Sequence, residues 1–236
     1  MEEARHQIDL WIAHGNPQKT LTIERLPITS LPPIPLTVRH LALRKLKITE
    51  VKWLPPSLAT LDITECPLKT LCSLPPTIES LCIGWCPLSR LPPLPPRLLV
   101  LYCFNTEVSE IPEIPPMVVG LSLHTNPKLL SLPPIPPSVD WITIRNTNIR
   151  VLPPLHPTFR VAHTENCPHL LVHMDGGDSE SYRARWAEVL DIERWVPRMK
   201  LIKEELMSIM WHPARVQYWM HAGGRSLVRQ MAGNDA

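Results

Sequence analysis

Residues 91–108 read LPPLPPRLLVLYCFNTEV, a proline-rich segment followed directly by an apolar run. Four prolines within residues 91–96 exclude a helix or a central strand there, because proline lacks a backbone N–H group and fixes φ. The run that follows alternates as a short strand does, with one side facing a core and the other facing solvent. The fold must therefore place an extended, proline-rich segment beside a strand.

The same pair of segments recurs through most of the chain. An aliphatic residue opens each proline-rich segment, at Leu31, Val51, Leu71, Leu91, Ile111, Leu132 and Leu152. These positions are 20 residues apart, except for one step of 21, and a partial unit precedes them at residues 21–29. Of the 29 prolines, 26 lie between Pro27 and Pro168. Self-similarity at such a period is the signature of a solenoid.

Within each unit the apolar residues keep one phase. One unit reads Leu58, Leu61, Ile63, Cys66 and Leu68, which fits the leucine-rich-repeat pattern L-x-x-L-x-L-x-x-N/C-x-L. The pattern predicts an α/β leucine-rich-repeat solenoid with short parallel β-strands and an extended, polyproline-like convex side. The N/C position predicts a turn, and it is taken by Cys66, Cys86, Thr106, Asn126, Thr147 and Cys167. Cysteines at this position serve packing rather than chemistry.

The repeat resembles the short Leu-Pro-X leucine-rich repeats of bacterial effectors of the YopM, IpaH and SspH kind, and leucine-rich-repeat proteins of large DNA viruses. The resemblance covers roughly residues 20–172 and implies a helical front cap and a pathogen-encoded protein. Residues 202–219, IKEELMSIMWHPARVQYW, are similar to a C-terminal motif of the viral proteins, roughly E-L-M-x-x-x-W-H-P-x-R. This motif favours a viral source over a bacterial one.

We expect three parts along the chain. Residues 1–19 form an N-terminal helical cap, in which Ala4, Ile8, Trp11 and Ile12 follow a helical spacing. Residues 20–174 hold about seven full repeats of 20–21 residues and one partial repeat. Beyond the turn at residues 175–178 the pattern becomes helical, so residues 175–236 are expected to form a C-terminal helical cap or tail. A docking module is the alternative for this tail.

Composition and charge narrow the classes of function. Hydrophobic residues make up 44% and charged residues 19%, and the formal net charge is only +2. Such a balance does not favour nucleic acid or an anionic membrane as a partner. The start, MEEARHQIDLWIAHG, does not resemble a secretion signal, and no apolar run has the length of a transmembrane segment. We expect a protein of the host cytoplasm or of a virion, not one secreted through a signal peptide.

The solvent-facing strand residues should line the concave face of the solenoid. One column reads Ala42, Asp62, Cys82, Tyr102, Ser122, Thr143 and His163, and the next reads Arg44, Thr64, Gly84, Phe104, His124, Arg145 and Glu165. Aromatic residues and arginine gather there as in binding hot spots. The predicted partner-binding residues are Trp85, Tyr102, Phe104, His124, Trp141 and Arg145. The alternative is that the tail or a neighbouring subunit covers them.

No enzymatic motif stands out, since there is no phosphate-binding glycine loop, hydrolase elbow or H-E-x-x-H sequence. Some effectors of the resembled kind carry a cysteine-dependent ubiquitin ligase domain after their repeats, but no cysteine follows Cys167. A truncated substrate-recognition part of such a ligase is therefore the less favoured alternative. His163, Cys167, His169 and His173 have a metal-like spacing, yet the repeat already accounts for the first two. We predict no metal and no cofactor.

The resulting prediction is a non-enzymatic protein–protein interaction module whose concave face binds a host or viral protein. A structural component of a virion coat is the alternative. His40, Arg44 and Lys45 form a basic spot rather than a stripe, so neither nucleic acid nor a membrane is expected to bind. The oligomeric state and the identity of the partner stay open.

Overall fold

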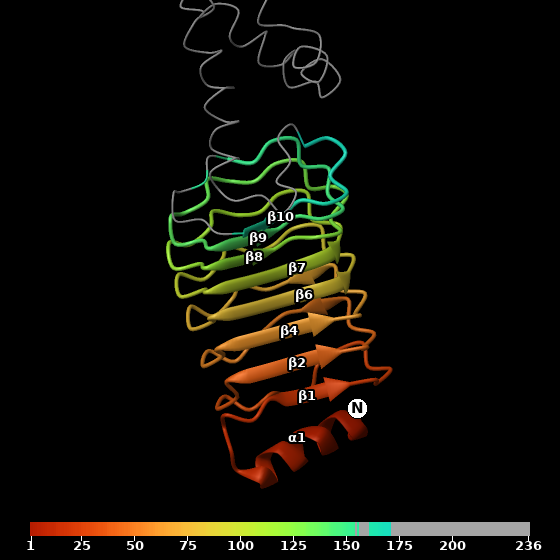
Figure 1. Cartoon of the computed structure of the whole chain (residues 1–236). Coiled ribbons are helices and arrows are strands. Elements are labelled where there is room, and N and C mark those ends of the chain that lie inside the picture. The colour runs from red at the N-terminus through yellow and green to blue at the C-terminus, as the bar shows by residue number, and fades with distance from the viewer. Residues whose placement is uncertain (154, 156–160, 171–236) are drawn as a thin grey trace, which may run out of the picture.

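The computed structural model describes residues 1–153, 155 and 161–170. An N-terminal helix, α1 (Glu2–His14), is followed by strands that stack one above another along a single axis (Figure 1). The main sheet contains β1 (Leu21–Glu24), β2 (His40–Arg44), β4 (Thr60–Thr64), β6 (Ser80–Cys86), β7 (Val100–Thr106), β8 (Gly120–Ser122), β9 (Trp141–Thr143) and β10 (Val161–His163). This arrangement confirms the predicted leucine-rich-repeat solenoid.

All eight strands are parallel and pair in chain order, β1-β2-β4-β6-β7-β8-β9-β10. Leu61 pairs with Leu81 and Leu81 with Leu101, so the register follows the 20-residue period. The single 21-residue step falls between β8 and β9, where Gly120 pairs with Trp141. On the return path, β3 (Glu50–Val51) and β5 (Thr70–Leu71) form a second, two-stranded parallel sheet.

The core is a continuous column of aliphatic side chains that the repeats contribute in turn. In β4, for example, Leu61 and Ile63 are buried while Thr60, Asp62 and Thr64 face outward. The six cysteines are free, and Cys103 is fully buried, as its inward strand position predicts. Because each repeat buries its apolar face only against its neighbours, the core depends on the stack as a whole.

The turn position after each strand is buried and satisfied by hydrogen bonds. Asn126 is fully buried, and its amide Nδ2 donates to the carbonyls of Cys103 (2.7 Å) and Leu123 (2.8 Å). Its Oδ1 accepts bonds from the backbone N–H and the hydroxyl of Thr106. The Cys86 thiol occupies the equivalent position and donates to the carbonyl of Gly84. The cysteines at these turns therefore replace Asn or Thr in a structural role.

The residue before each of these turn positions has a left-handed backbone, although none is glycine. The eight are Arg25, Lys45, Glu65, Trp85, Asn105, Thr125, Asn146 and Asn166, with φ between 51° and 58°. Backbone N–H bonds to the following repeat are formed by six of them, as in Arg25 N–H to Arg44 O (3.0 Å) and Lys45 N–H to Thr64 O (3.1 Å). These bonds hold a conformation that L-residues other than Asn rarely adopt.

The proline-rich segments return along the side opposite the main sheet and end in tight turns. Most of these turns place a proline at the second position, as in residues 95–98, where the Leu98 N–H donates to Pro95 O (3.1 Å). In three repeats the next residue ties its turn to the preceding repeat, and the Ser138 hydroxyl does so by donating to Val118 O (2.7 Å). The Thr77 hydroxyl donates to Pro56 O (2.8 Å) and Leu58 O (2.7 Å), and Ser57 bonds to Leu36 O and Val38 O. We call these contacts hydroxyl staples.

Helix α1 lies beside β1 at one end of the stack (Figure 1). It buries Ala4, Ile8 and Trp11, and the Trp11 indole N–H donates to Lys19 O (2.7 Å). Ile12, expected on the same face, is 53% exposed, because the buried stripe is narrow and Ile12 lies beyond its margin. Gly15, with φ of 67°, ends the helix. The predicted C-terminal cap or tail lies outside the described residues.

Candidate partner-binding face

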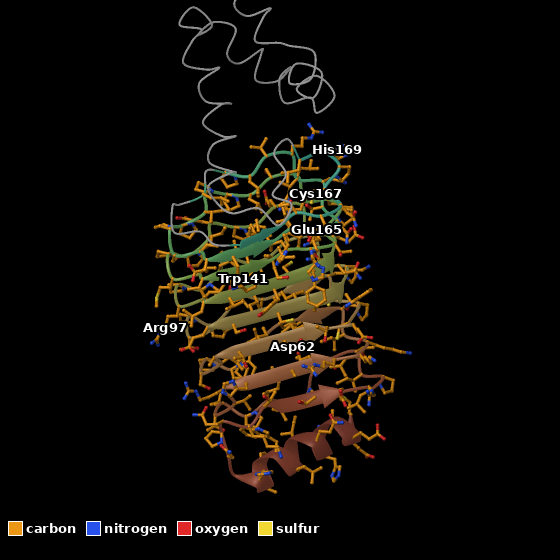
Figure 2. The ribbon with its side chains drawn as sticks, viewed as in Figure 1. Asp62, Arg97, Trp141, Glu165, Cys167 and His169 are labelled. Carbon is orange, nitrogen blue, oxygen red and sulfur yellow. The ribbon has the colours of Figure 1, made fainter. Side chains whose placement is uncertain are left out.

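Four of the predicted residues lie together on the solvent-facing side of the main sheet, the predicted concave face. Tyr102 and Phe104 are outward residues of β7, His124 follows β8, and Trp141 opens β9. Figure 2 shows Trp141 over the strands of the sheet. Tyr102 is 38% exposed, and the other three are half-buried. We call Tyr102, Phe104, His124 and Trp141 the aromatic patch.

The Trp141 side chain crosses a neighbouring strand to reach Tyr102. The two ring centroids are 6.1 Å apart, and the planes are tilted by 41°. Gly120, the register partner of Trp141, makes this possible, since a Cβ atom there would lie 2.2 Å from the indole atoms Cε2 and Cζ2. The missing side chain leaves the indole room to lie against the sheet.

A second ring pair has the same construction. Phe104 and His124 are stacked, with centroids 4.9 Å apart and planes within 15° of parallel. Phe104 lies over its register partner Gly84, where an added Cβ atom would be 2.3 Å from the ring atom Cζ. Sequence reasoning placed Gly84 in a column but missed its purpose. The available signal was a glycine 20 or 21 residues from an aromatic side chain at the same strand position.

The electrostatic surroundings of His124 favour a neutral ring. Burial lowers the pKa of His124, and the positive charge of Arg145 lowers it further. The His124 Nδ1 atom lies 3.2 Å from the Thr125 hydroxyl oxygen. A neutral imidazole stacks on Phe104 without the cost of burying a charge.

Arg145 borders the aromatic patch, but its charge is already paired. Its Nη2 donates to Glu165 Oε1 (2.9 Å), and its Nε donates to the other carboxylate oxygen. The pKa of Glu165 is lowered by a backbone hydrogen bond and by the bond to Arg145. His163 Nδ1 lies 3.3 Å from Arg145 Nη2. This edge of the patch is therefore close to electrically neutral.

Trp85 lies apart from the aromatic patch. It is 60% exposed, it has φ of 55° near the end of β6, and among the described residues it makes no ring contact with the other predicted site residues. Two small side chains of the predicted columns, Ala42 and Ser122, are buried rather than exposed. The sequence thus places the patch residues on one face but does not reveal which of them touch.

The opposite end of the face is also neutralised by ion pairs. Arg44 binds Asp62 through Nε (2.9 Å) and Nη2, and the Lys45 Nζ atom lies 3.5 Å from a Glu65 carboxylate oxygen. Burial, with the nearby charge of Asp62, raises the pKa of the Cys82 thiol to about 12. The basic spot expected at this end therefore carries little free charge.

The described residues of the set with a metal-like spacing do not converge. Cys167 is buried, and its thiol donates to the carbonyl of Ile144 (2.9 Å), whereas His163 lies on the sheet face beside Arg145. Within residues 1–153, 155 and 161–170 no three potential ligands gather at one point, and His173 lies outside that range. None of the helices in this described part has the length and apolar character needed to cross a bilayer.

Comparison with known proteins supports the repeat type. No family model matches the chain, and no curated protein matches it significantly. Among solved structures, YopM from Yersinia enterocolitica WA-314 superposes with a TM-score of 0.57 at 30% identity. That match covers 60% of this chain and 31% of YopM, so the chain corresponds to less than a third of that protein.

Two further structures have lower similarity. A leucine-rich effector protein, YopM from Yersinia pestis, gives a TM-score of 0.49 at 23% identity, covering 61% of this chain and 51% of that one. A Shigella effector leucine-rich-repeat domain gives 0.47 at 20% identity, covering 70% and 87%. The first match, together with the parallel strands, their 20-residue register and the proline-rich return segments, shows a leucine-rich-repeat fold whose repeats are similar to those of YopM.

Proposed function

We propose that the chain is a non-enzymatic protein-interaction module that binds a protein partner through the aromatic patch. The observation that carries this proposal is the pairing of rings on an open sheet face, Tyr102 with Trp141 and Phe104 with His124. Large aromatic side chains that are partly exposed and held in place are the usual anchors of protein interfaces. The interaction role of related repeats supports the same reading.

The two glycines make the patch ready for binding. Because Gly84 and Gly120 leave space beneath Phe104 and Trp141, the rings lie against the sheet before any partner arrives. A rigid aromatic side chain loses little conformational entropy when it becomes buried in an interface. We infer that affinity comes from burying these rings rather than from ordering a flexible loop.

The paired charges at both ends predict the chemistry of the interface. Arg44 is bound to Asp62 and Arg145 to Glu165, so the face offers the partner few free charges. Binding should therefore depend weakly on salt, in contrast to the steep dependence of phosphate recognition. This favours a protein partner over nucleic acid.

We further propose that a pathogen encodes the chain and that it acts in the host cytoplasm. The likeness to YopM, which one structure describes as a leucine-rich effector protein, supports this part of the proposal. A viral rather than a bacterial source rests on the motif at residues 202–219, which lies outside the described residues. Mass spectrometry of purified particles tests the alternative location, because a high copy number would indicate a virion component.

The decisive experiment compares proximity labelling by the wild-type chain and two variants in host cells. Tyr102→Ala combined with Phe104→Ala removes one ring from each pair and should reduce capture of the specific partner at least tenfold. Thr64→Ala, an outward residue of β4 outside the patch, is the matched control and should keep that partner. If the double variant folds normally and captures the same proteins at the same level, the proposal is wrong.

A further inference from the structure

The return segment of the fourth repeat, RLPPLPPR at residues 90–97, presents a distinct face to solvent. Its closely spaced prolines favour the polyproline II conformation, which has three residues per turn. Arg90, Pro93 and Pro96 follow that spacing and are all exposed, whereas Leu91 and Pro95 are buried against the core. Packing therefore selects one face of the segment, with the sequence R-x-x-P-x-x-P.

The backbone beside this face keeps a free acceptor. In the second and third repeats, hydroxyl staples from Ser57 and Thr77 occupy the carbonyls of Leu36 and Pro56. The residue that would donate to the Pro96 carbonyl in the same way is Met117 of the fifth repeat, which has no hydroxyl group. No other donor among the described residues reaches this carbonyl. A partner that binds over the exposed prolines could donate to this carbonyl.

Two arginines flank the segment without carboxylate partners. Neither Arg90 nor Arg97 forms an ion pair with any residue that the structure describes, and both are exposed. Figure 2 shows Arg97 at the outer margin of the solenoid. Lys52, at the start of the second return segment, is by contrast paired with Glu50 (2.9 Å). The segment thus joins an apolar ridge to unpaired positive charge.

We propose that residues 90–97 are a docking ridge for a polyproline-binding domain of the SH3 type. Such a domain offers an aromatic-lined groove for the prolines, side-chain donors for the backbone carbonyls, and carboxylates that match a flanking arginine. The ridge is already ordered by the fold, so binding has little conformational cost. The opposite orientation, which would be read from Arg97 through Pro95 and Pro92, is excluded because Pro95 is buried.

Comparison between repeats shows that the fourth is distinctive in this respect. The positions of Arg90 and Pro93 are held by Glu110 and Glu113 in the fifth repeat and by Thr70 and Ser73 in the third. The sixth repeat has the two prolines, Pro134 and Pro137, but Ser131 replaces the arginine. The fifth and sixth repeats therefore supply matched substitutions and a control site within the same protein.

The test uses the full chain and an array of purified, immobilised SH3 domains. At least one domain should retain the wild-type chain, and its dissociation constant should rise at least tenfold with Arg90→Glu and with Pro93→Glu. These changes copy the residues of the fifth repeat, so thermal unfolding should stay unchanged. Pro134→Glu in the sixth repeat and Tyr102→Ala in the aromatic patch should leave retention intact, which separates the ridge from the proposed concave site.

Three results would overturn the proposal. The first is that no SH3 domain retains the folded chain, and the second is that Arg90→Glu and Pro93→Glu bind as the wild type does. The third is that a synthetic peptide of residues 88–98 binds while the folded chain does not, because an SH3 domain could then bind the motif only when it is not part of the solenoid. Chemical shifts of the isotope-labelled SH3 domain must also change in its aromatic groove on addition of the chain.

Discussion

Trp141 and Gly120 are register partners on neighbouring strands, and the indole of the first lies across the backbone of the second. A methyl group at Gly120 would lie 2.2 Å from the indole, so the ring would have to move. The same relationship holds between Phe104 and Gly84. Two glycines of the sheet thus determine where two aromatic rings of the patch lie.

Gly120→Ala should displace Trp141 and weaken partner binding without unfolding the protein. The backbone of Gly120 does not need a positive φ, so alanine adds no backbone strain, and stability should change by less than about 1 kcal/mol. Titration calorimetry with the identified partner and a urea unfolding curve measure the two effects. In a double-mutant cycle, Gly120→Ala should add little to Trp141→Ala, whereas fully additive losses would contradict the relationship.

Asn126→Ala should be strongly destabilising. The fully buried amide serves the Cys103 and Leu123 carbonyls and both Thr106 donors, and alanine leaves these groups unsatisfied. We expect a loss of about 2–4 kcal/mol in the free energy of unfolding, measured in urea. Asn126→Thr, which copies Thr147 at the equivalent turn, is the control and should lose clearly less.

Trp85→Asn should stabilise the fold. Trp85 has φ of 55° and a largely exposed indole, while asparagine tolerates this left-handed conformation better. We expect the free energy of unfolding to rise by about 1 kcal/mol. The converse change, Asn105→Trp, places tryptophan at the equivalent turn and should lower it by a similar amount. A loss of stability in Trp85→Asn would contradict this prediction and would show that packing of the indole stabilises the fold by more than the backbone conformation costs.

Stability should fall in alkaline solution. The pKa of Cys86 and that of Cys103 are raised from 9.0 to about 11, in both cases mainly by burial. The unfolded chain therefore loses these protons first, and stability present below pH 9 is lost as the pH rises toward 11. Each thiol contributes a slope of about 1.4 kcal/mol per pH unit in that window.

Cys86→Thr, which copies the turn residue Thr106, should reduce that alkaline slope by the contribution of one thiol. Urea unfolding at several values between pH 8 and 11 measures the effect. Equal slopes in the wild type and Cys86→Thr would refute the assignment.

The Cys82 thiol, with a pKa of about 12, should be alkylated at pH 8 far more slowly than a free cysteine.

His124 should titrate below the ordinary histidine value of 6.5, because burial and Arg145 both disfavour its charged form. The stability that the neutral ring contributes is present above pH 6.5 and is lost as the pH falls below that value. NMR titration of the histidine ring signals measures the midpoint. Arg145→Ala should raise it only in part, since burial is the larger cause. A midpoint at or above 6.5 in the wild type would contradict the prediction.

The periodicity of the sequence predicts the fold because each repeat has the same task. A residue at L-x-L must face the core in every unit, so counting in steps of 20 also yields the register, as Leu61 and Leu81 show. The same counting explains why Cys66, Cys86 and Cys167 are structural. The fold, the strand register and the structural role of these cysteines all depend on which residues are buried, and the spacing of apolar residues in the sequence predicts burial.

The details of the candidate site escape that reasoning because they depend on side-chain rotamers and backbone angles. The period places Arg145 and Glu165 in one column, but only the structure shows them bound to each other. It groups Trp85 with Tyr102, whereas the left-handed turn carries Trp85 away from the rings. It places Gly84 in a column, but only the structure shows that the Phe104 ring covers this glycine.

The row of left-handed residues has a consequence for the order in which the chain assembles. Arg25 donates its N–H group to Arg44, Lys45 to Thr64 and Asn105 to His124, so each turn is held by a carbonyl made later in synthesis. A nascent repeat emerging from the ribosome cannot secure its own turn until the next strand has followed. Folding on the ribosome should therefore lag one repeat behind translation, and the most recently synthesised turn should lack this backbone hydrogen bond.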